Sequence, residues 1–294
     1  MNRAKIRTTL TPYLFLAVPV IIYLVWVIGP MIYSFYLSLT RWDGFSPPQF
    51  IGFSHFERLF RDPVFYTSLW NNLEWIAVFM TIPIAMGLFI AMSLNREIPG
   101  AKFFKASFFA PMVLSLVVSG LVWSWLYNPG FGLINTVLRR IGLESWARGW
   151  LSEPAVVMEA VIAVAVWRQI GYVMVLYLAG LQSVDKNLVD AAEVDGASAV
   201  QRFFHVILPQ LAPVTVVVIV ISIIDSLRAF DLVSVMTRGG PFNSSSVLAN
   251  YMYIQAFNNY NMGYGAAISV VLFMISLAFI MFYLTRIARE EANG

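Results

Sequence analysis

The sequence predicts an all-α polytopic membrane protein, and two observations carry this prediction. Of the 294 residues, 59% are hydrophobic and only 12% are charged. Average soluble domains carry roughly a quarter charged residues, so this composition argues against a water-soluble fold. The second observation is that six segments are long and apolar enough to cross a bilayer, which takes a helix of about 20 apolar residues. We therefore expect six transmembrane helices within a single domain, residues 1–294.

The six spans are expected, in chain order, at 12–39, 75–94, 104–127, 155–181, 211–236 and 264–285. The first span belongs to a charge-free run that is too long for a signal peptide, whose apolar core is roughly 7–15 residues. The fourth span carries Arg168, and the second half of the fifth span carries Asp225, Arg228 and Asp231.

An even number of spans places both termini on the same side of the membrane. The loops on that side hold more Lys and Arg residues than the loops on the other side. By the positive-inside rule this bias indicates cytoplasmic termini. The long loops, about 40–70, 128–154 and 237–263, then face outward. The predicted location is therefore multi-pass in a cytoplasmic membrane.

Several classes of function are disfavoured by what the sequence lacks. It has no cysteine, which excludes disulfides and thiolate metal sites, and its two histidines, His55 and His205, lie far apart and outside the spans. A metal site, or an intramembrane enzyme built on a histidine, is therefore not expected. No GxxxxGK phosphate loop is present, so this chain should not hydrolyse nucleotides itself. The net charge of +3 is too small and dispersed to suggest nucleic acid.

A polar segment, residues 185–209, separates the fourth and fifth spans and has the pattern of two helices hinged at Gly196. Asp185 or Ser183 can cap the first helix, and Gly196 can adopt the left-handed conformation that ends it. The second helix has amphipathic spacing and is expected to stop at Pro209. The segment carries four acidic residues against two basic ones, whereas a helix lying on lipid headgroups usually presents Lys and Arg. A protein partner is therefore preferred over the lipid surface.

This segment resembles the EAA motif in permease subunits of bacterial ABC importers, where E-A-A is followed at fixed spacing by G, I and L-P. The matching residues are Asp190-Ala191-Ala192, Gly196, Val206 and Leu208-Pro209. Asp190 replaces the motif's Glu and Val206 replaces its Ile. Other stretches resemble the sugar-uptake branch, namely "TPYLFLAVPV", "NPGFGLIN", "LYLAGLQSVDKNLVDAAEVDGAS" and "FDLVSVMTRGGPFNSSSVLANYMYIQAF". In the last of these, Arg238 stands where many relatives carry glycine.

The resemblance implies a coupling hairpin that docks in a groove of a separate ATP-hydrolysing subunit. The residues implied in this ATPase coupling are Asp190, Ala191, Ala192, Glu193, Gly196, Leu208 and Pro209. The implied partners are a second homologous permease, two ATP-binding cassette subunits that bind ATP and Mg, and a periplasmic or extracellular solute-binding protein. The implied function is import of a sugar or sugar derivative across the bacterial inner membrane, without catalysis, cofactor or metal in this chain.

Ionisable groups inside a membrane are costly and are functional candidates by default. The candidates for the substrate path are Trp167, Arg168, Tyr172, Asp225, Arg228, Phe230 and Asp231. Aromatic rings could stack on a sugar, and the charged groups could bond its hydroxyls. In the alternative without a substrate role, Asp225 and Arg228 only neutralise each other at i, i+3 spacing, and Arg168 snorkels or pairs across the bundle.

The sequence leaves two further alternatives open. The two arginines permit an anionic sugar, phosphorylated or sulfonated, in place of a neutral one. An ion-coupled secondary transporter is the rival mechanism, and it should show inverted repeats. No convincing repeat relates residues 1–147 to 148–294, so an ATP-driven importer is preferred.

Overall fold

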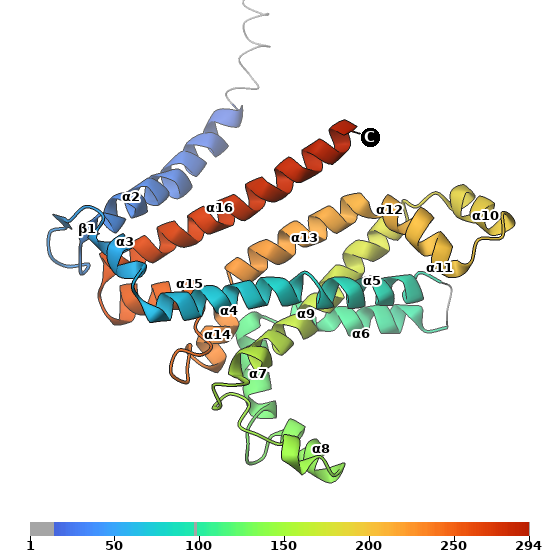
Figure 1. Ribbon diagram of the computed structural model, residues 1–294, viewed down its shortest axis with the longest axis horizontal. Helices are drawn as coiled ribbons and strands as arrows, with labels where there is room; N and C mark the ends of the chain where they lie inside the picture. The colour runs from blue at the N-terminus through green and yellow to red at the C-terminus, as the bar shows by residue number, and fades with distance from the viewer. Residues whose placement is uncertain (1–14, 97–98, 294) are drawn as a thin grey trace, which may run out of the picture. The chain divides into compact units, whose positions relative to one another are not determined.

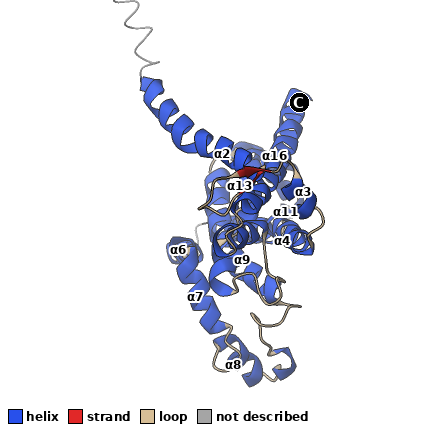
Figure 2. Ribbon diagram, turned by 90° about the vertical axis from the view of Figure 1, so that its left-hand side faces the viewer, coloured by secondary structure: helices blue, strands red, loops and turns tan. Residues whose placement is uncertain are grey.

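The computed structural model describes residues 15–96 and 99–293, most of which are helical (Figure 1). In this described part, strands occur in one short antiparallel sheet, drawn in red in Figure 2, where Thr40 of β1 (Thr40–Arg41) pairs with Phe50 of β2 (Gln49–Phe50). The helices and helical turns are η1 (Leu24–Ile28), α2 (Gly29–Ser38), α3 (Ser54–Leu59), α4 (Pro63–Phe79), α5 (Ile82–Leu94), α6 (Ala101–Val113), α7 (Leu116–Leu126), α8 (Leu133–Arg140), η2 (Glu144–Trp146), α9 (Val157–Leu181), α10 (Lys186–Val194), α11 (Ala199–Arg202), η3 (Phe203–Ile207), α12 (Leu208–Gln210), α13 (Ala212–Leu227), α14 (Asp231–Met236), α15 (Leu248–Tyr253), η4 (Ile254–Asn258) and α16 (Met262–Asn293).

Among the described residues, four helices are long and apolar enough to cross a membrane: Phe15–Ser38, Pro63–Leu94, Val157–Leu181 and Met262–Tyr283. Two further pairs pass the same test together but are bent, by 99° between α6 and α7 and by 69° between Gln210 and Ala212. Counting each bent pair as one span gives up to six spans. The predicted membrane fold is confirmed at this coarser level, and the number of six stays a prediction.

Three helix boundaries differ from the limits expected from the sequence. The second apolar helix begins at Pro63 rather than Trp75, because proline is well suited to the first turn of a helix. The fifth expected span is not continuous to Met236, since α13 ends at Leu227 and α14 begins only at Asp231. Pro209 does not stop its helix, which continues to Gln210. The preceding turn η3 is π-helical, with the Leu208 N–H bonded to the Phe203 carbonyl, and this altered register accommodates the proline.

The chain divides into two compact units, one formed by residues 1–62 with 252–274 and the other by residues 63–251 with 275–294. In the second unit, α9 packs against α4, α5, α6, α13 and α14. Small residues permit these close approaches, as is common between helices in membranes. An added Cβ at Gly171 would overlap the carbonyl oxygen of Phe108 on α6, and one at Gly87 on α5 would lie 2.6 Å from Val173.

Replacing Gly171 with valine should lower the stability of the second unit by about 1–3 kcal/mol, because the new side chain cannot fit against the α6 backbone. Thermal unfolding of the detergent-solubilised protein measures this loss. Ala163→Val, at an exposed position of the same helix, is the matched control. Equal melting temperatures for the two variants would contradict the close packing of α6 on α9.

In the first unit, the segment after the sheet packs on the start of α16. Tyr264 is fully buried, its hydroxyl donates to Asp62 Oδ2 over 2.6 Å, and the Arg58 guanidinium lies 4.1 Å from its ring centroid. His55 Nε2 lies 3.0 Å from the Thr40 carbonyl oxygen. In the loop between the strands, backbone N–H groups of Ser46 and Phe45 donate to Asp43 and lower its pKa to about 2.

Acidification should loosen this segment through His55. Partial burial lowers the pKa of His55 below its ordinary value of 6.5, so the folded state favours the neutral ring. The contribution of His55 to stability is therefore complete above pH 6.5 and is lost as the pH falls through the lowered pKa. Hydrogen exchange of residues 40–62, divided by the intrinsic exchange rate at each pH, should rise between pH 7.5 and 5.5 in the natural protein and rise less in His55→Gln. An equal rise in both would contradict this role of His55.

Candidate functional site

The first candidate site lies where the helix of the fifth apolar segment is interrupted. The segment "SLRAFDLV", residues 226–233, holds the end of α13, three non-helical residues and the start of α14. Asp225 stands one turn before the break, Arg228 and Phe230 lie within it, and Asp231 begins α14. Interrupted helices at membrane depth are tolerated where they line a cavity, and in transporters they often mark binding sites.

A second break, between α6 and α7, lies on the same cavity. Ser115 caps α7, with its hydroxyl oxygen accepting from the Val118 N–H over 3.2 Å. In a continuous helix the Met112 carbonyl would bond to the N–H of Leu116. The break frees this carbonyl, and Arg168 Nη2 of α9 donates to it over 3.2 Å. Arg168 thereby joins α9 to the broken pair.

The two breaks and α9 enclose a cavity of about 250 Å³, which we call the polar pocket. Its lining residues are Trp75, Phe79, Met112, Leu116, Ala165, Arg168, Gln169, Asp225, Arg228, Ala229, Phe230, Asp231 and Leu232. The lining contains two arginines and two aspartates, and Arg168 interacts electrostatically with both Asp225 and Asp231. The formal charge of the lining is therefore balanced.

Two buried donor atoms of pocket-lining residues have no hydrogen-bond partner within the described part of the chain. They are the indole Nε1 of Trp75 and the Nε of Arg168, whereas the Gln169 side chain bonds to the Asp225 carboxylate. Buried polar groups in native proteins are almost always paired, so two unpaired donors at one cavity need an explanation. Hydroxyl groups of a bound solute, or water, would supply the missing acceptors.

The structure brings together five of the seven residues predicted for the substrate path: Arg168, Asp225, Arg228, Phe230 and Asp231. Trp167 and Tyr172 are not in the lining, and Trp167 instead meets Trp123 edge-on, with ring centroids 5.5 Å apart. Sequence reasoning missed Gln169 and Trp75. Gln169 could have been predicted, because it is a polar residue beside Arg168 in an apolar span. Trp75 could not, because aromatic residues are common in apolar helices.

The second candidate site is the hinged segment, which we call the hairpin, residues 185–210. Asp185 caps α10 by accepting from the Asn187 N–H. Gly196 has φ +83° and follows the end of α10. Its N–H bonds to the Glu193 carbonyl over 3.0 Å, and the Ala197 N–H bonds to the Ala192 carbonyl over 2.9 Å. These two bonds form a Schellman motif, which satisfies carbonyls that the helix end would leave free.

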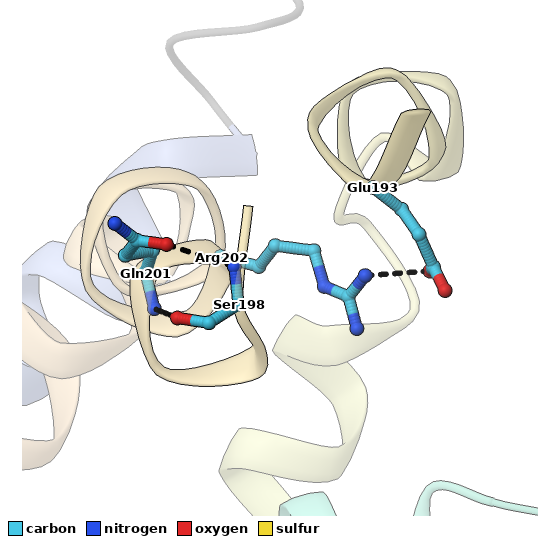
Figure 3. A network of polar contacts seen from close by, with 4 residues as sticks. All are labelled: Glu193, Ser198, Gln201 and Arg202. Atoms are coloured by element: carbon cyan, nitrogen blue, oxygen red, sulfur yellow. Dashed lines mark hydrogen bonds and ion pairs between the residues drawn. The ribbon is translucent and has the colours of Figure 1, made fainter. Parts of the chain in front are cut away.

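The two arms of the hairpin are joined at both ends. Near the elbow, Arg202 Nη1 lies 2.7 Å from Glu193 Oε2, and Ser198 and Gln201 form a reciprocal capping box that starts α11 (Figure 3). At the base, the Asp185 N–H donates to Gln210 Oε1 over 2.9 Å. Glu193, which was assigned to the ATPase, thus pairs within the hairpin in this structure.

The remaining residues assigned to ATPase coupling lie along the two arms. Asp190, Ala191, Gly196 and Pro209 are exposed, while Ala192 and Leu208 are half-buried. Most of this set therefore presents a free surface, on which small side chains leave the backbone accessible.

Apolar helices long enough to cross a bilayer, together with breaks beside a charged cavity, define a membrane transport protein. The chain belongs to the family of binding-protein-dependent transport system inner membrane components, which it matches over residues 74–290. This confirms the family predicted from residues 190–209. As a member, the chain is a membrane component of an ABC transporter and not itself an enzyme.

Named relatives extend over nearly the whole chain. It is 36% identical to the arabinooligosaccharides transport system permease protein AraP of Bacillus subtilis, covering 90% of this chain and 85% of the relative. It is 33% identical to the sulfoquinovosyl glycerol transport system permease protein SmoG of Agrobacterium fabrum, covering 91% and 86%. A solved bacterial ABC transporter that imports the acidic polysaccharide alginate has a chain with a TM-score of 0.84, covering 97% and 98% at 23% identity, which shows a shared fold.

Proposed function

We propose that this chain is the membrane subunit of an ATP-driven, binding-protein-dependent importer of a sugar or sugar derivative. In this role it forms half of the translocation pathway. The observation that carries the proposal is the polar pocket, where charged and aromatic groups gather at two helix breaks among membrane-spanning helices. Relatives whose names specify sugar substrates support the same class. Membership of the family leaves the ion-coupled transporter without support.

The proposed assembly contains parts that this chain lacks. A second homologous permease completes the pathway, two ATP-binding cassette subunits bind ATP and Mg, and a solute-binding protein delivers the sugar from outside. The chain itself would cross the membrane six times, with both termini in the cytoplasm. The hairpin between α9 and α13 would receive the closing movement of the ATPase, with Asp190, Ala192 and Gly196 at the contact.

For the substrate we favour a neutral, hydroxyl-rich sugar. Each arginine of the polar pocket is offset by an aspartate, so a net negative substrate would face repulsion from Asp225 and Asp231 as well as attraction. Mixed donors and acceptors suit hydroxyl groups, which do both. The two arginines keep an anionic sugar as the second candidate, and one relative is named for a sulfoquinovosyl compound.

The test is to express the chain with its candidate partners, reconstitute the complex in proteoliposomes, and screen neutral and acidic sugars for stimulation of ATP hydrolysis and uptake. We expect at least one neutral sugar to stimulate both when the binding protein is present. Uptake by the purified chain alone, or an assembled complex that no sugar stimulates, would overturn the proposal.

A further inference from the structure

Two neighbouring asparagines of α4, Asn71 and Asn72, are buried in an apolar helix. Their exposed fractions are 5% and 0%. A buried carboxamide is costly unless its donors and acceptor are hydrogen-bonded, and a membrane offers no water to replace a missing partner. Where the two side chains bond therefore indicates what they hold in place.

The Asn72 carboxamide bonds to the end of one helix and the start of another. Its Nδ2 donates to the carbonyl oxygen of Ser226 over 2.9 Å, and its Oδ1 accepts from the Leu248 N–H over 2.8 Å. Ser226 lies in the last turn of α13, whose carbonyls lack partners further along the helix, and Leu248 is the first residue of α15. Ser226 and Leu248 are both fully buried. One side chain thus bonds to two helix ends: it supplies the partner of the Leu248 N–H, and it adds a shorter bond to the Ser226 carbonyl, which also accepts from the Ala229 N–H over 3.4 Å.

The Asn71 carboxamide bonds elsewhere. Its Nδ2 donates to the carbonyls of Ser244 and Ser246 over 2.8 and 2.7 Å, while Ser68 on the same helix donates to the Ser246 hydroxyl. These hydrogen bonds join Asn71 to residues 244–246 and not to the end of α13. Asn71 and Asn72 therefore form a matched pair. Both side chains bond to the segment 244–248 that follows α14, and only Asn72 also bonds to the end of α13.

We infer that Asn72 is a positioning residue for the polar pocket. By capping α13 at Ser226, it stabilises the helix end from which Arg228 and Phe230 turn into the pocket lining. By the same carboxamide it ties this break to the start of α15. A displacement of the segment 244–248 is thereby transmitted to the pocket. This inference rests on the proposed function, because it assigns a role in shaping the site that the sugar would occupy.

Hydrogen exchange of the full chain in lipid nanodiscs tests the geometry without a substrate. Asn72→Leu removes both hydrogen bonds at nearly constant volume, so exchange of the amides at 226–232 and 248–250 should rise by roughly tenfold or more. Asn71→Leu should raise exchange at 244–247 and leave 226–232 unchanged. Asn72→Ala removes the same two hydrogen bonds without adding bulk, should raise exchange at the same amides, and serves if the leucine variant does not fold. An equal pattern in the Asn71 and Asn72 variants would overturn the inference.

A functional readout separates positioning from general stability. In the assembled transporter, Asn72→Leu should change the sugar concentration for half-maximal ATPase stimulation by roughly tenfold, while Asn71→Leu leaves it unchanged. The sugar used is one that stimulates the natural complex. If the natural complex responds to no sugar, the proposed function fails. If it responds and the two variants do not differ, the inference about Asn72 fails and the proposed function stands.

Discussion

Gly196→Asp is expected to abolish the coupling of ATP hydrolysis to uptake while leaving the protein folded. Gly196 has φ +83°, and a Cβ built there meets no atom within 4 Å. Aspartate is among the few residues that tolerate this left-handed backbone, so the elbow should keep its shape. The new carboxylate would join an acidic surface with Asp195 and Glu193. An uncompensated charge placed in a docking contact costs several kcal/mol, so uptake should fall by at least about tenfold.

Gly142→Asp is the control for this result. Gly142 has the same φ of +83° and equally open surroundings, but it follows α8, far from the hairpin in sequence. Backbone strain would affect both variants alike, whereas a docking role affects only Gly196. Uptake and sugar-stimulated ATPase activity measure the outcome in proteoliposomes. Full activity in Gly196→Asp, or equal losses in both variants, would contradict the coupling role.

Arg168→Gln should reduce uptake by roughly 10- to 100-fold, because hydrogen bonds from charged groups are the strong ones. The substitution removes the bond from Nη2 to the Met112 carbonyl and leaves that freed carbonyl at the break between α6 and α7 without its partner. It also leaves Asp225 and Asp231 with only Arg228 to balance them in the lining of the polar pocket. Uptake of neutral and acidic sugars by the reconstituted complex measures the effect.

Arg139→Gln is matched to this variant, because Arg139 also donates from Nη2 to a backbone carbonyl, that of Pro129, but at an exposed position outside the spans. It should keep nearly full uptake. Uptake of neutral and of acidic sugars is then compared in Arg168→Gln and in Arg228→Gln, and this comparison separates the substrate classes. Equal losses for neutral and acidic sugars support the neutral assignment, and a loss confined to acidic sugars would establish the anionic alternative.

Local chemistry predicted a large part of this fold. The apolar run at 155–181 gave α9 to within two residues at its start and to the residue at its end. The cap at Asp185 and the positive φ of Gly196 follow from the properties of single residues and needed no tertiary information. The EAA spacing then identified the family. In each case the signal lies within a short stretch of chain.

The breaks could not be predicted in this way. Residues 228–230 contain neither glycine nor proline, so nothing local ends α13 there. The end is supported by a distant side chain, Asn72, through the Ser226 carbonyl. Adjacency in sequence also misled the choice of pocket residues. Successive residues of a helix point in directions about 100° apart, so Trp167 turns to Trp123 while Arg168 lines the cavity.

The most direct test uses the absence of cysteine from this chain. Ala192→Cys introduces a single thiol at a half-buried position of α10, and a reagent that alkylates this thiol and carries a photoreactive group is applied to membranes that contain the assembled transporter and then illuminated, so that it bonds to whichever chain lies beside it. The proposed function predicts a crosslink between this chain and the ATP-binding subunit, with a yield that changes when ATP is bound. A chain that copurifies with no ATPase, or that forms crosslinks only within its own membrane partners, would contradict it.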